Sequence, residues 1–289
     1  MSSEKWIPDF KALQPSFDLA IAEDIGDGDH SALSCLNSNE KGKVKLLAKE
    51  NGIIAGVALS KYLFTTIDPT AVVSVFIQDG SRIHTGDIVL EVEGNSIKLL
   101  QAERLVLNYI QRLSGIATST SKCAALVAHT SCTILDTRKT TPGLRILEKW
   151  AVVLGGGGNH RMGLYDMIML KDNHIDFCGG IGQAIEKSIG YLKIHQLNFP
   201  IIVETRTLSE VKSALEYAGI KRILLDNMTV EIIKQAVDLV DHQVPLEASG
   251  NINSDNIRAF AETGVDFISM GYITYGATII DMSFRMKKP

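Results

Sequence analysis

Short apolar runs recur along the second half of the chain, and each is followed closely by charged or small residues. From Ile201 onward the runs return roughly every 20 to 25 residues, which is the length of a strand, a helix and two short loops. The stretches between them, such as 208–218 and 229–239, carry apolar residues at helical spacing. Strands that alternate with helices form a parallel sheet, and six or more such units predict closure into a barrel. The runs occupy residues 132–135, 167–170, 201–203, 223–225, 246–248 and 267–270.

The charged residues that follow these runs are sorted by sign. Arg138, Lys139 and Lys171 follow the early runs, whereas Glu204 and Asp226 follow later ones. The C-terminal strand ends of such a barrel form its active-site face, so these five side chains are expected to converge. A single charge after an apolar run commonly marks only the point where a strand reaches solvent. The sorted set instead favours a strongly anionic substrate held with a divalent metal such as Mg²⁺, which takes one or two carboxylates plus substrate phosphates.

The first hundred residues have a different pattern of predicted helices and strands. Residues 15–24 and 58–67 read as helices, and residues 44–49, 71–77 and 88–92 read as strands joined by turn-forming residues. This pattern predicts a separate α+β unit. A long apolar helical stretch over 100–129, broken near Ser114 and Gly115, is expected to lead into the barrel. The tail from Tyr272 to Pro289 is too short for another strand and helix, and we expect it to pack back on the first region.

Composition narrows the class of protein. The chain has 289 residues, a formal net charge of −4 and a pI near 6.0, which argue against nucleic-acid or membrane-surface binding. Cys35, Cys123, Cys132 and Cys178 lie far apart and lack metal-ligand spacing, so reduced thiols are expected. The first residues carry no apolar signal region, and no run approaches the roughly 20 apolar residues of a membrane span. These features predict a cytoplasmic enzyme.

Several weaker signals accompany the strand ends. Four glycines at 155–158 could cradle an anion with their N–H groups, although a glycine run alone is more often a flexible hinge. The neighbouring His160 and Arg161 favour an anion site, because arginine binds carboxylates in bidentate fashion. Ser249, Gly250 and Asn251 offer a hydroxyl and N–H groups near a helix start, as a phosphate site requires. Arg104 would pass for a solvated charge on the long helix.

Six segments, taken together and in this order, resemble the quinolinate phosphoribosyltransferase family, whose members are also called carboxylating nicotinate-nucleotide pyrophosphorylases. The likeness covers nearly the whole chain. It implies an N-terminal α/β sandwich domain over 1–112, an incompletely closed α/β barrel over 113–272, and a tail over 273–289 that packs on the first domain. The segments are EDIGDGD (23–29), AERLVLNYIQRLSGIAT (102–118), LDTRKTTPGLR (135–145), GGGGNHRMGLYDMIMLKDNHI (155–175), LLDNM (224–228) and EASGNI (247–252).

The resemblance implies a reaction and a role for each site residue. Quinolinate and phosphoribosyl pyrophosphate would give nicotinate mononucleotide, pyrophosphate and CO₂ with Mg²⁺, in de novo NAD synthesis, within a homodimer or a dimer-based hexamer. Lys139 would meet the pyrophosphate or the ribose, and Glu204 and Asp226 would hold metal and ribose hydroxyls. Lys139, Lys171, Glu204 and Asp226 form the expected catalytic set. The two carboxylates of quinolinate would be held by Arg138, His160, Arg161, Lys171 and, from the neighbouring subunit, Arg104; the 5′-phosphate would be held by Ser249, Gly250, Asn251 and Gly271.

Two departures from the family pattern stand out. Family members often carry two alternating glutamates in the third barrel strand, whereas Ile202 here precedes Glu204 by two positions. A common threonine, histidine and serine run is replaced by Thr274, Tyr275 and Gly276, which puts the local phosphate contacts in question. The alternative functions are a nicotinate phosphoribosyltransferase, which needs to grip one carboxylate only, and a noncatalytic anion-binding paralogue of the same fold, such as one linked to metal transport. The dense set of cations favours the dicarboxylate.

Overall fold

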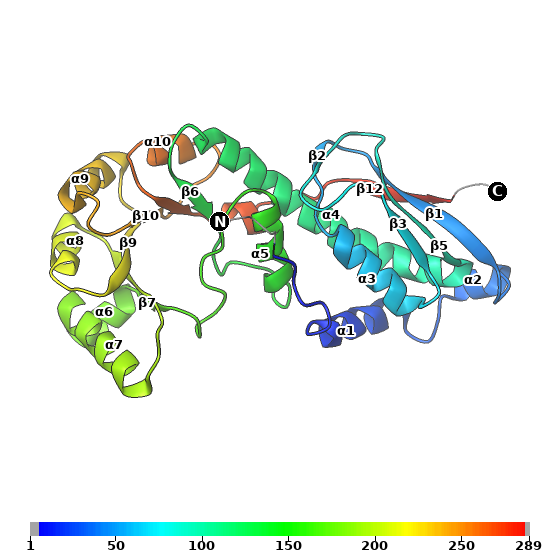
Figure 1. The fold of residues 1–289 in the computed structure, drawn as a ribbon, viewed down its shortest axis with the longest axis horizontal. Helices are drawn as coiled ribbons and strands as arrows, with labels where there is room; N and C mark the ends of the chain where they lie inside the picture. Colours follow the sequence, from blue (N-terminus) through cyan, green and yellow to red (C-terminus); the bar gives the residue numbers. More distant parts are fainter. Residues whose placement is uncertain (1–5, 287–289) are drawn as a thin grey trace. The chain divides into compact units, whose positions relative to one another are not determined.

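The computed structural model describes residues 6–286, which form two compact units (Figure 1). The first unit, called here the sandwich unit, runs to Ser121 and also includes Thr141–Gly156 and the chain from Ala277 onward. The second, called the barrel unit, contains Lys122–Thr140 and Gly157–Gly276.

The division differs in detail from the predicted domains at 1–112, 113–272 and 273–289. The main difference is residues 141–156, which belong to the sandwich unit. These residues carry helix α5 (Arg145–Leu154), whose buried Glu148 accepts hydrogen bonds from Arg112 Nε and Nη2 at 3.2 and 3.1 Å. Residues 1–5 and 287–289 of the predicted first domain and tail lie outside the described residues.

The sandwich unit contains a four-stranded antiparallel sheet in the order β12-β1-β5-β3. Strand β1 (Lys41–Ala48) buries alternate residues, as a strand with one covered face should. The tail supplies β12 (Met282–Met286), which pairs with β1, and its Phe284 packs edge-on against Phe64 of α3. The other elements are α1 (Gln14–Ile25), α2 (His30–Cys35), β2 (Gly52–Ile53), α3 (Val57–Ile67), β3 (Val72–Val75), β4 (Arg82–Ile83) and β5 (Ile88–Asn95).

Helix α4 (Ser96–Val127) is continuous, so the predicted break near Ser114 and Gly115 was wrong. Both residues serve close packing instead. The Ser114 hydroxyl accepts from the Ala55 N–H at 3.0 Å, and a Cβ at position 115 would collide with the Thr278 carbonyl. Although α4 is long, none of the helices in residues 6–286 is both long and apolar enough to cross a membrane.

The barrel unit contains a six-stranded parallel sheet in the order β6-β11-β10-β9-β8-β7 (Figure 1). Within the described chain, no pairing joins the two edge strands β6 and β7, so the barrel is incompletely closed, as predicted. The strands are β6 (Thr133–Leu135), β7 (Ile168–Leu170), β8 (Ile201–Thr205), β9 (Ile220–Asp226), β10 (Leu246–Ser249) and β11 (Phe267–Ser269).

Helices cover the outside of this sheet, which explains why its strands are apolar without alternation. All five residues of β8 are buried, and Ile201 and Val203 pack with Ile185 of α7. Helices α8 and α9 begin at threonine caps, where Thr207 accepts from Glu210 N–H and Thr229 from Ile232 N–H. The helices are α6 (Asp172–Cys178), α7 (Ile181–His195), α8 (Leu208–Leu215), α9 (Val230–Val240), α10 (Ile257–Ala261) and α11 (Tyr272–Tyr275).

Candidate active site

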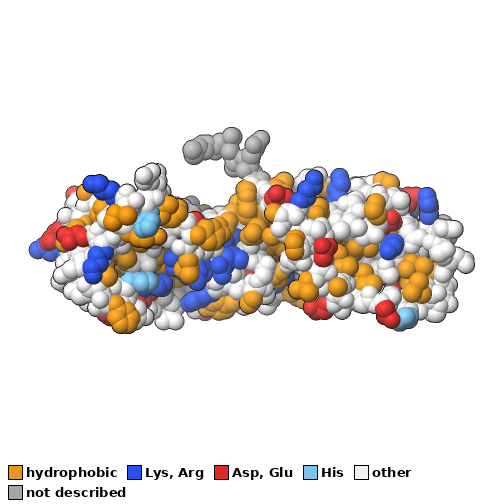
Figure 2. Space-filling model, turned by 90° about the horizontal axis from the view of Figure 1, so that it is seen from below, with side chains coloured by type: hydrophobic (Ala, Val, Ile, Leu, Met, Phe, Trp, Pro, Cys, Tyr) orange, Lys and Arg blue, Asp and Glu red, His pale blue; other side chains and the backbone are white. Residues whose placement is uncertain are grey.

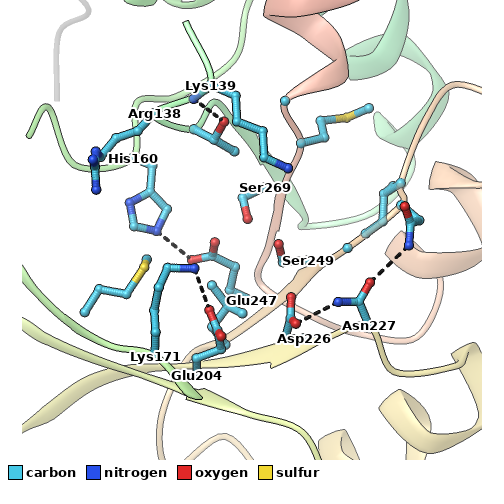
Figure 3. Close-up of a pocket in the computed structure, with 18 of the residues that line it drawn as sticks. Arg138, Lys139, His160, Lys171, Glu204, Asp226, Asn227, Glu247, Ser249 and Ser269 are labelled. Atoms are coloured by element: carbon cyan, nitrogen blue, oxygen red, sulfur yellow. Dashed lines mark hydrogen bonds and ion pairs between the residues drawn. The ribbon is translucent and has the colours of Figure 1, made fainter. Parts of the chain in front are cut away.

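A cavity of about 630 Å³ opens in the barrel unit at the C-terminal ends of its strands (Figure 3). Every predicted site residue except Arg104 lines it: Arg138, Lys139, His160, Arg161, Lys171, Glu204, Asp226, Ser249, Gly250, Asn251 and Gly271. The expectation that the strand ends meet at one site is therefore confirmed. The roles of the individual residues stay predictions.

Strand register explains why these side chains meet. Glu204 of β8 lies opposite Leu224 of β9, and Asp226 follows Leu224 by two residues on the same face. Asp226 in turn lies opposite Ser249 of β10, and Ser249 lies opposite Ser269 of β11. Because alternate residues point to one face of a strand, the two carboxylates and two hydroxyls all face the cavity.

Asp136, which follows β6, organises the segment that carries His160 and Arg161. Its buried carboxylate accepts from the Asn159 side-chain amide at 2.6 Å and from the His160 N–H at 2.9 Å. Gly158 pairs with the end of β6 through its N–H to the Ile134 carbonyl at 2.8 Å. The glycines at 155–158 do not line the cavity, so the suggestion that they cradle an anion was wrong. At Gly158, a Cβ would press against the Leu135 side chain, so close packing requires glycine there.

His160 and Arg161 are buried, at 7% and 8% exposure. The Arg161 N–H donates to His160 Nδ1 at 2.7 Å, and His160 Nε2 lies 3.4 Å from Glu247 Oε2 (Figure 3). Since Nδ1 accepts a hydrogen bond, the neutral ring carries its proton on Nε2, facing the carboxylate. Nδ1 is thus engaged by the main chain, and Nε2 points toward the carboxylate of Glu247.

The cavity concentrates positive charge. Burial lowers the pKa of the Arg161 guanidinium, the nearby positive charge of Arg138 lowers it further, and Asp166 and Glu204 partly offset both effects. Figure 2 shows a group of lysine and arginine side chains gathered near the middle of the face in view. Two guanidinium groups that repel each other form a site that an anionic ligand would stabilise.

Lys171 and Glu204 form an ion pair at the edge of the cavity. Lys171 Nζ and Glu204 Oε2 are 3.0 Å apart, with Glu204 buried and the Lys171 side chain 47% exposed (Figure 3). The Lys171 backbone N–H donates to His174 Nδ1 at 3.0 Å, which fixes the start of α6 directly behind the lysine. Lys171 therefore has a set backbone position and a side chain that can turn toward a ligand.

The loops after β10 and β11 expose backbone groups to the cavity. Gly250 has φ +103°, and a Cβ there would overlap the Asn227 side chain. Asn251 donates to Asn227 Oδ1 at 3.1 Å, and Asn227 donates to Asp226 Oδ2 at 2.7 Å (Figure 3). At Gly271 a Cβ would meet the Tyr275 ring at 2.6 Å. In parallel barrels the loops after the last two strands frequently bind phosphate, which agrees with the predicted phosphate residues.

Sequence reasoning missed several residues that line the cavity. The most important is Glu247 of β10, which is 0% exposed and pairs with Arg222. A carboxylate inside the apolar run 246–248 was the signal that could have revealed it, because charged residues are rarely buried without a partner. The other lining residues outside the predicted site set are Thr137, Met169, Leu224, Asn227, Ile252, Ser269, Met270 and Tyr275, of which the last three lie in a segment, 269–276, whose small residues the sequence already offers as a weak phosphate signal.

Arg104 is an exposed residue of α4 in the sandwich unit and is not among the residues that line the cavity. Burial raises the pKa of the neighbouring Glu103 carboxyl, and the positive charge of Arg104 lowers it by a smaller amount. The predicted role of Arg104 toward a neighbouring subunit stays a prediction.

The structure locates both departures from the family pattern. Ile202 is buried and lies opposite Arg222 in the strand register. The isoleucine cannot pair with this arginine, and among the described residues Glu247 of the next strand forms the ion pair with it. Tyr275 is 64% exposed and lines the cavity, with its ring against Gly271. Thr274 is buried, and its hydroxyl contacts the Lys139 carbonyl at 2.9 Å, which fixes the main chain at that lysine.

Glu204 and Asp226 are suitable for a metal that is bound together with substrate. In residues 6–286 no group of three or more His, Cys, Asp or Glu side chains could hold a metal ion alone. Mg²⁺ does not require such a group, because it usually keeps several waters and takes one or two carboxylates plus substrate phosphates. Two carboxylates that face a cation-rich cavity from neighbouring strands fit that pattern.

Comparison with known proteins identifies the family. The N-terminal and C-terminal domain models of quinolinate phosphoribosyl transferase match residues 29–114 and 116–285. The chain is 43% identical to the chloroplastic nicotinate-nucleotide pyrophosphorylase [carboxylating] of Oryza sativa subsp. japonica, over 99% of this chain and 82% of that protein. It is 40% identical to a probable enzyme of the same name from Bacillus subtilis, over 90% of this chain and 89% of that one.

A solved structure agrees with these matches. NadC from Streptococcus pyogenes superposes with a TM-score of 0.91 at 37% identity, covering 98% of each chain. Sequence and fold thus agree over both units, and the chain belongs to the quinolinate phosphoribosyltransferase family.

Proposed function

We propose that the protein converts quinolinate and phosphoribosyl pyrophosphate to nicotinate mononucleotide, pyrophosphate and CO₂, a step in NAD biosynthesis. The observation that carries this proposal is the pair of guanidinium groups at Arg138 and Arg161, close enough for one to lower the pKa of the other. A pyridine with two adjacent carboxylates carries negative charge at two neighbouring points, which matches two neighbouring guanidinium groups. The names of the relatives, which are carboxylating pyrophosphorylases, support the same reaction.

Quinolinate binds at the cationic side of the cavity. Arg138 and Arg161 hold the carboxylates, and Lys171 reaches them from the mouth of the cavity. The engaged ring of His160 contributes by holding the Arg161 main chain. This arrangement orients the pyridine nitrogen toward the phosphoribosyl side, and orientation of this kind lowers the entropic cost of a two-substrate reaction.

Phosphoribosyl pyrophosphate binds at the opposite side. Ser249, Gly250, Asn251 and Gly271 receive the 5′-phosphate through hydroxyl and backbone N–H groups, in the loops after β10 and β11. Lys139, whose main chain Thr274 anchors, interacts with the pyrophosphate. Asp226 and Glu204 face the space between the two ends.

Mg²⁺ would be held by Glu204 and Asp226 together with the substrate. When bound, it would neutralise charge on the departing pyrophosphate. Lys171 already neutralises Glu204 in the arrangement described here, at 3.0 Å. Metal binding at Glu204 would release Lys171 from this pair and leave it available to a quinolinate carboxylate.

The reaction needs positioning and electrostatics, and no covalent nucleophile from the protein. The pyridine nitrogen forms a bond to the anomeric carbon while the bond from that carbon to pyrophosphate breaks, and the electron pair leaves with pyrophosphate. Positive charge develops on the ribose ring, which the carboxylate of Asp226 can stabilise. The pyridinium then accepts the electron pair left when the adjacent carboxylate departs as CO₂, and that carbon takes up a proton.

The two alternative functions differ in what the cavity must hold. A nicotinate phosphoribosyltransferase grips one carboxylate and has no use for the second guanidinium of the pair. A noncatalytic anion-binding protein has no need of Glu204 and Asp226 facing the same space as the cations. The complete set of cations and carboxylates favours the decarboxylating transferase over both.

The assembly and the compartment belong to the same proposal. We expect a homodimer, or a hexamer built of dimers, in which Arg104 completes the quinolinate site of the neighbouring subunit. Mixing Arg104→Ala with Arg138→Ala protein under subunit exchange should then restore activity, because some sites receive both arginines. A mixture that stays inactive despite exchange would contradict the shared site.

A cytoplasmic location agrees with four free cysteines among the described residues, and cell fractionation would check it.

The function is tested by incubating the purified protein with phosphoribosyl pyrophosphate, Mg²⁺ and either quinolinate or nicotinate. We expect nicotinate mononucleotide from quinolinate alone. Turnover of nicotinate alone would assign the non-decarboxylating reaction, and turnover of neither substrate would favour the binding protein.

A further inference from the structure

A buried ion pair, of which Glu247 lines the cavity, has no role in the function proposed above. Arg222 Nη1 of β9 and Glu247 Oε2 of β10 are 2.6 Å apart. Glu247 is fully buried, and the Arg222 side chain is 16% exposed. The guanidinium also lies over the Phe267 ring of β11, 3.8 Å from its centroid. The pair therefore links three neighbouring strands of the barrel.

Such a pair is costly as a purely structural device. The free-energy cost of removing two charges from water is offset only when the geometry of the pair is excellent. Replacing a buried ion pair by apolar residues of similar volume therefore often leaves the stability of a protein unchanged or raises it. Burial alone would raise the pKa of Glu247, but His160, Arg222 and Ser269 together lower it, so the carboxylate is charged at neutral pH. Arg222 supplies the charge that makes a buried carboxylate tolerable at this depth.

The same carboxylate oxygen also faces His160. Glu247 Oε2 lies 3.4 Å from His160 Nε2, so one oxygen serves both Arg222 and the histidine (Figure 3). On the other side of the ring, Nδ1 accepts the Arg161 N–H at 2.7 Å. The His160 N–H is held by Asp136 at 2.9 Å. The ring is consequently held at Nδ1 and at its own main chain, while Nε2 faces the Glu247 carboxylate.

The position of Arg161 depends on this ring. Its N–H is held by the ring of the preceding residue, and its guanidinium lines the cavity beside Arg138. With its proton on Nε2, the ring offers Nδ1 as an acceptor; the opposite tautomer would place an N–H against the Arg161 N–H. A carboxylate facing Nε2 favours the first tautomer.

We propose that Glu247, neutralised by Arg222, is a positioning residue that fixes the tautomer and orientation of His160 and thereby aims the Arg161 guanidinium at a carboxylate of quinolinate. This inference rests on the proposed function. It predicts a defect confined to the quinolinate side of the cavity, because the loops after β10 and β11 are held by other contacts, such as Asn227 N–H to the Ser249 carbonyl at 2.8 Å.

The test separates positioning from folding by replacing the whole pair. Arg222→Met with Glu247→Met leaves no unpaired charge, so the melting temperature should stay near that of the wild type. Titration calorimetry should show a dissociation constant for quinolinate that rises by up to about 100-fold, as small misplacements of a binding group can cost. Binding of phosphoribosyl pyrophosphate with Mg²⁺ should be unchanged. In the matched variant, Arg222→Met with Glu247→Gln, part of the quinolinate affinity should return, because the amide oxygen accepts from Nε2–H.

Several outcomes would overturn the inference. A folded Met–Met variant that binds quinolinate as the wild type does would leave the ion pair a structural element only, and so would an equal loss of affinity for both substrates. If that variant does not fold, the quinolinate affinity of Glu247→Asp provides the test. The shorter side chain keeps a negative charge near Arg222 but withdraws the carboxylate from His160. Wild-type affinity in the aspartate variant would again contradict positioning. A wild-type protein that binds phosphoribosyl pyrophosphate but not quinolinate would remove the proposed function itself, and the inference with it.

Discussion

At the scale of single residues, the chemistry of the cavity depends on cations brought close together. Arg161 is buried, and its pKa is lowered by burial and by Arg138. Exposed Lys139 and half-exposed Lys171 add mobile positive charge at the rim. Such a set costs the empty protein stability and favours a dianion strongly.

Arg138 is exposed in the empty cavity, so its replacement by alanine should lower kcat/KM for quinolinate by the equivalent of about 1.5 to 3 kcal/mol, the usual worth of hydrogen bonds to a charged group. The KM for phosphoribosyl pyrophosphate should change little, because the phosphate side is built from other residues. Steady-state kinetics with each substrate varied would measure both. Arg258→Ala is the control, since Arg258 is an exposed guanidinium of the same unit that does not line the cavity. Activity within a few-fold of wild type in the Arg138 variant would refute the assignment.

Glu204→Gln combined with Asp226→Asn should weaken the response of the rate to Mg²⁺, because amides are poorer ligands than carboxylates for a hard cation. A magnesium titration at fixed substrate would show a shift of the half-saturating concentration to higher metal. Asp238→Asn provides a control on the exposed side of α9. If the titration curve of the double variant coincided with that of the wild type, the two carboxylates would not be metal ligands.

Residue-level reasoning from the sequence found the charges at strand ends but not the charge within a strand. Arg138, Lys171 and Asp226 follow apolar runs, so the pattern itself marks them. Glu247 interrupts such a run, and its meaning depends on Arg222 and His160, which lie far from it in the chain. Contacts of that kind follow from the order of strands in the sheet, which local pattern does not contain.

At the scale of elements, the parallel strands predict the site because their C-terminal ends meet. The six strands of the barrel unit fall within or next to the apolar runs seen in the sequence. The predicted break in α4 failed for a definable reason: Ser114 and Gly115 are tolerated in a helix interior because one bonds to Ala55 and the other makes room for Thr278. The glycines at 155–158, offered as an anion cradle or a hinge, likewise include one, Gly158, that close packing requires. In both places small residues serve packing that only the tertiary structure reveals.

The loop after β10 should tolerate no side chain at Gly250. Gly250→Ala combines a left-handed φ of +103° with overlap of the Asn227 side chain, so the loop must shift. We expect the KM for phosphoribosyl pyrophosphate to rise while the quinolinate KM stays near its wild-type value. Gly190→Ala in α7 is a suitable control, because nothing lies within 4 Å of the added carbon. Equal kinetics for the Gly250 variant and its control would exclude this loop as the phosphate site.

At the scale of the whole molecule, the cysteines report how well the fold excludes reagents. Burial raises the pKa of Cys123 to about 11 and that of Cys132 to about 12, the latter with help from Asp266, whereas Cys35 is exposed. A thiol reagent at neutral pH should modify Cys35 first and reach Cys123 and Cys132 only after unfolding, since the thiolate is the reactive form. Mass spectrometry of the labelled peptides would identify the order, with Cys35→Ser as the control. Labelling of the buried pair as fast as Cys35 would contradict the packing described.

The central claim concerns the whole reaction: one cavity transfers the phosphoribosyl group and releases CO₂. The most direct measurement uses quinolinate labelled in the carboxylate next to the ring nitrogen and counts labelled CO₂ against nicotinate mononucleotide during initial turnover. The mechanism predicts equal amounts of the two products, and none of either without phosphoribosyl pyrophosphate. Nucleotide formed without release of the label, or release of the label without nucleotide, would contradict it.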